Sequence, residues 1–113
     1  MSSFDEREKN FEKKFAHDEE TQFKISARRN KYLGQWASKL MSFDEEKESE
    51  YIQSVIKADF EESGDEDVFR KLQGDLKNFN ISDSEIREKM TELNEKAKTD
   101  FKYFFYSFIY IFI

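Results

Sequence analysis

The acidic stretch DFEESGDEDVFR, residues 59–70, has the residue types and part of the spacing of a calcium-binding loop. Such a loop takes oxygen ligands from its first, third, fifth, seventh and ninth residues, and its sixth residue is glycine. Here those places hold Asp59, Glu61, Ser63, Asp65, Asp67 and Gly64. The twelfth place holds Arg70 instead of the glutamate that closes the site. We therefore interpret the stretch as the end of one helix and the acidic start of the next, and we predict no metal site.

The basic run at residues 28–31 could hold the phosphate groups of a nucleotide. Arg28, Arg29 and Lys31 supply guanidinium and ammonium groups, which bind phosphate oxygens in many proteins. The competing interpretation is a polar helix face whose charges form salt bridges within the folded domain. An adenine-nucleotide-binding regulatory protein is therefore the alternative function, with these three residues as its binding site.

Catalytic chemistry has no support in the sequence. His17 is the single histidine and there is no cysteine, so histidine dyads and thiolate metal sites are excluded. The sequence also lacks a glycine-rich phosphate loop and an HExxH motif. We interpret His17 as a solvated residue rather than a pH sensor. The prediction is a protein that is not an enzyme and has no cofactor.

Composition narrows the class of protein further. The 113 residues include no proline and three glycines, which indicates a single domain rich in long helices. The net charge of -6 disfavours nucleic acid as a partner, because phosphate contacts need a clustered positive surface. The start, MSSFDEREK, is too polar for a secretory signal, so we expect the protein in the cytoplasm.

Four helices are predicted, because apolar residues recur every three or four positions. The first is expected over about residues 5–40, and the others from Ser42, Asp65 and Ser82. Ser42 and Ser82 each precede a glutamate by three residues, which is the spacing of a capping box. The expected apolar faces are, in helix order, Ile25, Tyr32, Leu33, Trp36 and Leu40; Tyr51, Ile52, Val55 and Ile56; Val68, Phe69, Leu72 and Leu76; and Ile86, Met90, Leu93 and Ala97. We expect Trp36 to be largely buried.

The predicted fold is all-α, a small antiparallel four-helix bundle over residues 21–100 with a long first helix whose N-terminal part extends beyond the bundle. Phe4, Phe11 and Phe15 share one face of that helix at about 100° per residue. Polar residues then interrupt this face: Asp18, Gln22 and Arg29. Residues 1–20 therefore form a separate segment with an aromatic face for another protein. Pairing with a second copy, or folding back on the bundle, are the alternatives.

After Asp100 the sequence becomes aromatic and apolar, FKYFFYSFIYIFI. This tail, residues 101–113, is shorter than the ~20 residues that a helix needs to cross a bilayer, so we predict no membrane span. Its aromatic and β-branched residues favour a strand, or aggregation, over a helix. We interpret it as an atypical hydrophobic tail outside the selected fold. Packing on the bundle and contact with a membrane surface are the alternatives.

Three stretches in order, FDEREKNFEKKFAHDEETQFK, ARRNKYLGQWA and ADFEESGDEDVFRKL, resemble the zeta subunit of alphaproteobacterial F-type ATP synthases. The resemblance covers roughly residues 1 to 97. The tail from Phe101 departs from it, because members of this family are expected to end in a short polar segment.

The resemblance implies a four-helix bundle that inhibits ATP hydrolysis. Its N-terminal segment would enter the catalytic head of the synthase, among the alpha, beta and gamma subunits, and block rotation in the hydrolytic direction. By position, the partner-binding residues are Phe4, Asp5, Arg7, Glu8, Phe11, Phe15, Ala16 and His17. The resemblance also implies a location peripheral to the inner membrane and, in some members, a weak site for ATP or ADP on the bundle.

The residues themselves are compatible with this role. Burial of Phe4, Phe11 and Phe15 in a groove would contribute about 1.5–3 kcal/mol for each ring, before the entropy of ordering the segment. Charged side chains between the rings, Lys14 among them, would set the register against the partner.

Overall fold

A computed structural model describes residues 19–61 and 65–112, and the side chains of residues 19–60 and 65–103. Over these residues the chain forms four α-helices and a short 3-10 helix: α2 (Glu19–Leu40), α3 (Glu45–Glu61), α4 (Asp65–Asp75), η1 (Lys77–Phe79) and α5 (Asp83–Phe112). The described residues contain no strand, which confirms the all-α prediction.

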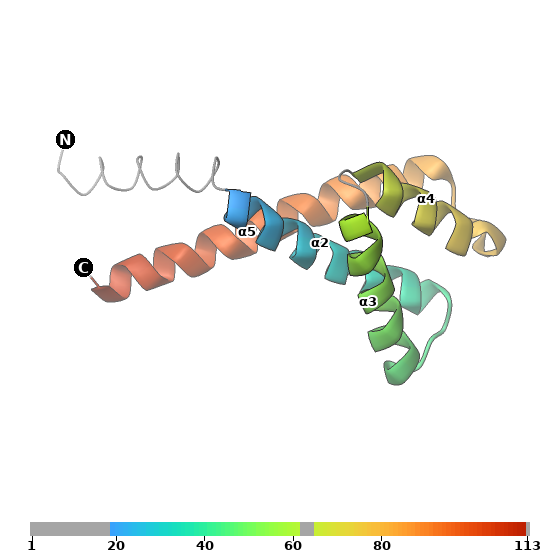
Figure 1. Ribbon diagram of the computed structural model, residues 1–113, viewed down its shortest axis with the longest axis horizontal. Helices are drawn as coiled ribbons and strands as arrows, with labels where there is room; N and C mark the ends of the chain where they lie inside the picture. Colours follow the sequence, from blue (N-terminus) through green and yellow to red (C-terminus); the bar gives the residue numbers. More distant parts are fainter. Residues whose placement is uncertain (1–18, 62–64, 113) are drawn as a thin grey trace.

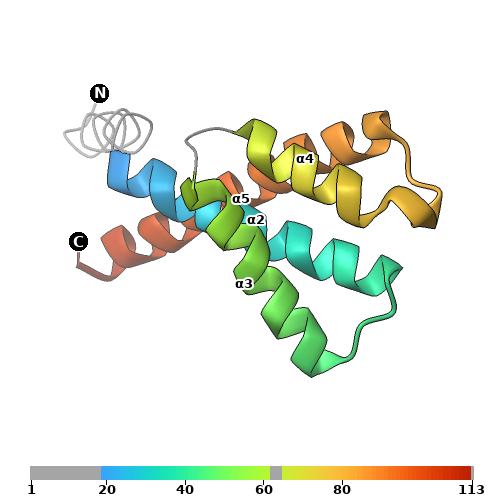
Figure 2. The same cartoon turned by 45° about the vertical axis from the view of Figure 1, so that its right-hand side comes forward.

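The helices contact one another in a ring: α2 touches α3 and α5, and α4 touches α3 and α5. Figure 1 shows α5 running in the opposite direction to α2 and crossing it obliquely, and α3 also crosses α2 at an angle. Figure 2, turned by 45°, shows the same relationship. That the four helices form one regular antiparallel bundle stays a prediction.

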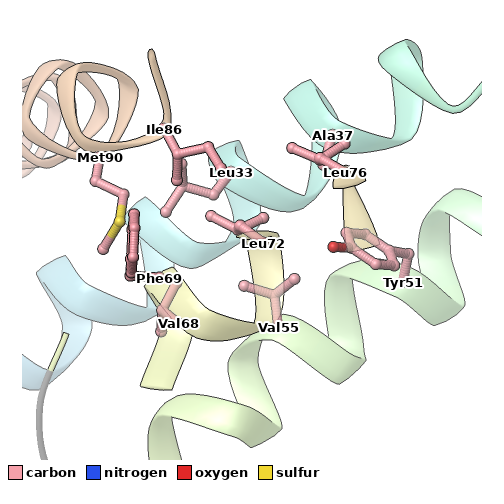
Figure 3. Close-up of a cluster of buried hydrophobic side chains, with 10 residues drawn as sticks. All are labelled: Leu33, Ala37, Tyr51, Val55, Val68, Phe69, Leu72, Leu76, Ile86 and Met90. Atoms are coloured by element: carbon pink, nitrogen blue, oxygen red, sulfur yellow. The ribbon is translucent and has the colours of Figure 1, made fainter. Parts of the chain in front are cut away.

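The hydrophobic core receives side chains from all four helices. Figure 3 shows these buried residues: Leu33, Ala37, Tyr51, Val55, Val68, Phe69, Leu72, Leu76, Ile86 and Met90. The apolar face expected for the third helix is confirmed, because all four of its residues are buried: Val68, Phe69, Leu72 and Leu76. In the last helix Ile86, Met90 and Ala97 are buried, and Leu93 packs on the core while partly exposed.

The predicted start of the second helix at Ser42 is wrong. Ser42 instead ends α2, with a left-handed φ of 58°. The amide of Ser42 donates to the Lys39 carbonyl at 3.2 Å, and the amide of Phe43 donates to the Ser38 carbonyl at 3.0 Å. This is a Schellman motif, and it leaves Ser42 unable to cap the next helix.

Two other side chains provide the N-terminal caps of α3 and α5. Asp44 Oδ1 accepts the backbone amide of Lys47 at 2.9 Å, so Asp44 caps α3. Ser82 caps α5 as predicted, because its Oγ accepts the amide of Glu85 at 3.2 Å and donates to the Glu85 carboxylate at 3.3 Å.

The prediction that Trp36 is largely buried is confirmed in part: Trp36 packs against the core but is not one of its fully buried residues. The buried face of α2 is centred on Leu33 and Ala37, both fully buried, with Gly34 against α3. Trp36 lies beside this face at the edge of the core, partly exposed. Lys89 Nζ lies 5.9 Å from the centre of its ring.

The strand preference expected for residues 101–113 is also wrong, since α5 continues as a helix to Phe112. No glycine or proline interrupts the sequence between Asp83 and Phe112. Once a helix is nucleated, each further residue adds a backbone hydrogen bond, and this outweighs a weak preference for strand. Among the described residues, none of the helices combines the length and apolar character needed to cross a membrane.

Candidate functional site

The predicted partner-binding residues of the N-terminal segment lie outside the residues that the structure describes: Phe4, Asp5, Arg7, Glu8, Phe11, Lys14, Phe15, Ala16 and His17. Their role stays a prediction. The description begins at Glu19, and the chain joins the folded domain almost at once, because Thr21 and Ile25 are already buried.

The structure separates the three basic residues predicted to bind a nucleotide. Arg28 is exposed, donates from Nε to the Tyr32 hydroxyl at 2.8 Å, and lies 3.5 Å from the carboxylate of Asp100 on α5. The Tyr32 hydroxyl in turn donates to Asp100. Lys31 is exposed. Arg29 is buried, although it lies between two exposed basic residues in the run. The difference arises because successive residues of a helix point about 100° apart.

Arg29 joins three helices through a partly buried polar network. Its Nη1 donates to Asp65 Oδ1 at the start of α4 at 2.7 Å, and its Nη2 lies 3.8 Å from Asp59 Oδ2 on α3. Asn30 completes the network: its Oδ1 accepts from Arg29 Nε at 3.1 Å, and its Nδ2 donates to Asp59 Oδ2 at 3.0 Å. Asp59 and Asp65 are the first and seventh residues of the calcium-like stretch, and here they bind a guanidinium.

An open pocket with a volume of about 210 Å³ lies beside this network. Its lining residues are Arg29, Asp65, Arg87, Met90, Thr91 and Asn94. Arg87 is held by a bidentate pair with Glu66 at 2.7 and 3.1 Å, and its guanidinium stacks 3.5 Å from the Phe69 ring centre. The hydrogen bond from Arg87 lowers the pKa of Glu66. An anion entering the pocket would meet two guanidinium groups, each of which already has a carboxylate partner.

Sequence reasoning named Arg29 but missed its partners and the contribution of Arg87. The available signal was the position of Arg29 on the apolar sector of its helix. A charged side chain in such a sector must either interrupt the core or be paired inside it. The choice between these depended on Asp59 and Asp65, which the fold brings from about thirty residues away.

Comparison with known proteins gives a match over most of this chain. No curated protein sequence matches it. A family model described as ATPase inhibitor subunit zeta matches residues 1–100. The match takes in the N-terminal segment and the described helices up to Asp100, and ends where the aromatic tail begins. Because it covers most of the sequence, the chain belongs to the ATPase inhibitor subunit zeta family.

Proposed function

We propose that this protein inhibits ATP hydrolysis by the F-type ATP synthase, and that residues 1–20 are the segment that enters the catalytic head. The observation that carries the proposal is the family match over residues 1–100, which includes that segment in full. In this role the protein has no catalytic residues of its own, and it lies in the cytoplasm, peripheral to the inner membrane through the synthase.

The folded domain that follows residues 1–20 supports this proposal. The buried hydrophobic residues of the described part run from Ile25 to Ala97, and the polar network at Arg29 ties α2 to α3 and α4. The described helices thus form one packed body whose first helix begins where the segment ends. Inserted among the alpha, beta and gamma subunits, a segment fixed to such a body would block rotation in the hydrolytic direction.

The test is to add the purified chain to isolated ATP synthase head and to membranes carrying the whole synthase. We expect ATP hydrolysis to fall with increasing chain, while ATP synthesis driven by a proton gradient falls much less. A chain lacking residues 1–19 serves as the control and should leave both rates unchanged. Equal loss of hydrolysis and synthesis would contradict a block that depends on the direction of rotation.

A second candidate function, the adenine-nucleotide-binding regulatory role, is favoured by the pocket beside Arg29. Of the three residues named for it, only Arg29 lines that pocket, and Arg87 joins it there from α5. Titration of the isotope-labelled protein with ATP by NMR would test this role. Amide shifts around Thr91 and Asn94 would support it, whereas shifts confined to the surroundings of Lys31 would place the nucleotide elsewhere.

A further inference from the structure

Two phenylalanine rings from different helices form an exposed aromatic pair on the described surface. Phe23 on α2 and Phe60 on α3 have ring centroids 5.1 Å apart, with a tilt of 52° between the ring planes. Phe23 is nevertheless 52% exposed and Phe60 is 60% exposed. Neither residue belongs to the hydrophobic core. Two exposed rings in contact, brought together from separate helices, form a contiguous apolar patch, and such patches are where proteins bind one another.

The position of this pair relative to the N-terminal segment indicates what covers it. Phe23 lies four residues after Glu19, which is about 6 Å along the axis of α2 at 1.5 Å per residue. The eighteen residues before Glu19 include the whole aromatic face attributed to the inhibitory segment. A protein that holds this segment up to its end therefore lies about one helical turn from Phe23. Phe60 adds a second ring to this surface, although its helix, α3, is far from the segment in the sequence.

We propose that Phe23 and Phe60 form a second docking surface, which binds an apolar patch on the ATP synthase head beside the site that receives residues 1–20. This inference rests on the proposed function and adds a contact made by the folded domain. Since the segment continues in the sequence directly into α2 at Glu19, only a short stretch of chain separates the two contacts, and the second raises the effective concentration of the first. The aromatic pair should therefore act mainly by slowing dissociation of the inhibitor.

The test uses three full-length variants, Phe23→Ser, Phe60→Ser and the control Phe79→Ser. Phe79 is also an exposed phenylalanine, 42% exposed, but it lies in η1, at the far end of the molecule from Glu19 (Figure 1). We expect each of the first two variants to need about tenfold more protein for half-inhibition of ATP hydrolysis, and to dissociate faster from the head. That tenfold loss corresponds to about 1.4 kcal/mol. The control should match the wild type.

Phe60→Ser is the decisive variant, because Phe60 lies far from the inhibitory segment in the sequence. If the wild type inhibits and Phe60→Ser inhibits equally well, the docking surface is wrong while the proposed function stands. If the wild type does not inhibit, the proposed function itself fails. Stronger inhibition by Phe60→Ser would indicate that the pair binds the chain's own N-terminal segment instead. A dimer of the wild type in solution that Phe60→Ser converts to a monomer would indicate that the pair binds a second copy. Either result overturns the proposal. Thermal unfolding of each variant checks that it is folded.

Discussion

Arg29 Nη1 donates a 2.7 Å hydrogen bond to Asp65 Oδ1, although the Arg29 side chain is 4% exposed and that of Asp65 is 66% exposed. The same guanidinium lies 3.8 Å from Asp59, whose side chain is only 20% exposed. The shorter contact thus involves the more hydrated carboxylate. Water screens an ion pair with an exposed partner, so distance alone is a poor guide to which carboxylate stabilises the fold more.

We predict that Asp59→Ala destabilises the fold more than Asp65→Ala does. Removing Asp59 leaves the buried amide of Asn30 without its acceptor and Arg29 with one carboxylate fewer, which should cost about 2–3 kcal/mol. Removing Asp65 leaves Asp59 in place and should cost about 1 kcal/mol, including the loss of a carboxylate at the start of α4. Urea unfolding of both variants measures the difference. A larger loss of stability in Asp65→Ala would show that the 2.7 Å contact with Asp65 stabilises the fold more than the contacts of Asp59 do.

Some elements of this fold follow from local sequence. The cap at Ser82 was predictable because its partner Glu85 is three residues away, and the apolar face from Val68 to Leu76 was predictable because no charged residue interrupts it. Ser42 offered the same spacing to Glu45, but the end of α2 took Ser42 into a left-handed conformation and left the cap to Asp44. Local spacing therefore identifies candidates for a cap, and the neighbouring helix decides between them.

Other features depend on distant partners and could not be read from local sequence. In the sequence Arg29 interrupts the apolar face of its helix. Its pairing could not be predicted, because the two carboxylates that bind it come from other helices. Trp36 was placed in the core by its position in the apolar sector, and it packs there, but the fully buried residues are Leu33 and Ala37, beside the close approach of α3 at Gly34. The inhibitory role of residues 1–20 stays a prediction, since those residues precede the described fold except for Glu19 and Glu20.

Gly34 and Gly74 provide a matched pair of helical glycines with opposite expected responses. A Cβ at Gly34 would lie 2.8 Å from Ile52 Cγ1 and 2.9 Å from Ile52 Cα, so α3 would have to move. Gly34→Ala should cost about 1–3 kcal/mol despite the higher helix propensity of alanine. A Cβ at Gly74 meets nothing within 4 Å, and Gly74→Ala should stabilise the fold by about 0.5–1 kcal/mol. Thermal unfolding of both variants provides the check. Equal shifts of the thermal midpoint in the two variants would mean that α2 and α3 pack less closely at Gly34 than described.

Tyr51 should make the fold sensitive to alkaline pH. Its hydroxyl donates to Asp75 at 2.8 Å, and Lys71 bonds the same carboxylate at 3.0 Å. Burial, together with this hydrogen bond, raises the pKa of Tyr51 well above its ordinary range. The unfolded chain releases the tyrosine proton near pH 10 while the folded chain retains it, so this stabilisation is complete below pH 10 and is lost as the pH rises further.

Tyr51→Phe should therefore cost about 1 kcal/mol at pH 7, for the lost hydrogen bond. Above pH 10 its stability should fall less steeply than that of the wild type. Tyr103→Phe is the control, because Tyr103 is 74% exposed. Stability measured by urea unfolding between pH 7 and pH 11 tests both statements. Parallel curves for wild type and Tyr51→Phe would contradict the assigned role of the hydroxyl.

Deletion of residues 104–113 should leave the folded domain intact. Asp100 must be kept, because it binds Arg28 and Tyr32, and so must Phe101, whose ring centre lies 5.9 Å from the Arg28 guanidinium. The family match also ends at residue 100. We expect the thermal midpoint to fall by less than about 5 °C and solubility to rise, because an aromatic, apolar sequence is removed. A drop of more than about 10 °C would place the tail within the stabilising core.

The inhibitory segment can be tested separately from the fold with the double variant Phe11→Ser/Phe15→Ser. If these rings bind a partner, their loss should change the stability of the free protein by less than about 0.5 kcal/mol, as for surface substitutions. It should also abolish inhibition of ATP hydrolysis by the isolated head, because two apolar anchors are replaced by hydroxyls. The matched control is Phe79→Ser, which removes an exposed ring from η1 and should leave inhibition unchanged.

A core role for Phe11 and Phe15 predicts the opposite pairing, in which the double variant loses several kcal/mol of stability and inhibition fails only because the protein unfolds. A double variant that is folded and still inhibits at the wild-type concentration would exclude the aromatic face as the contact.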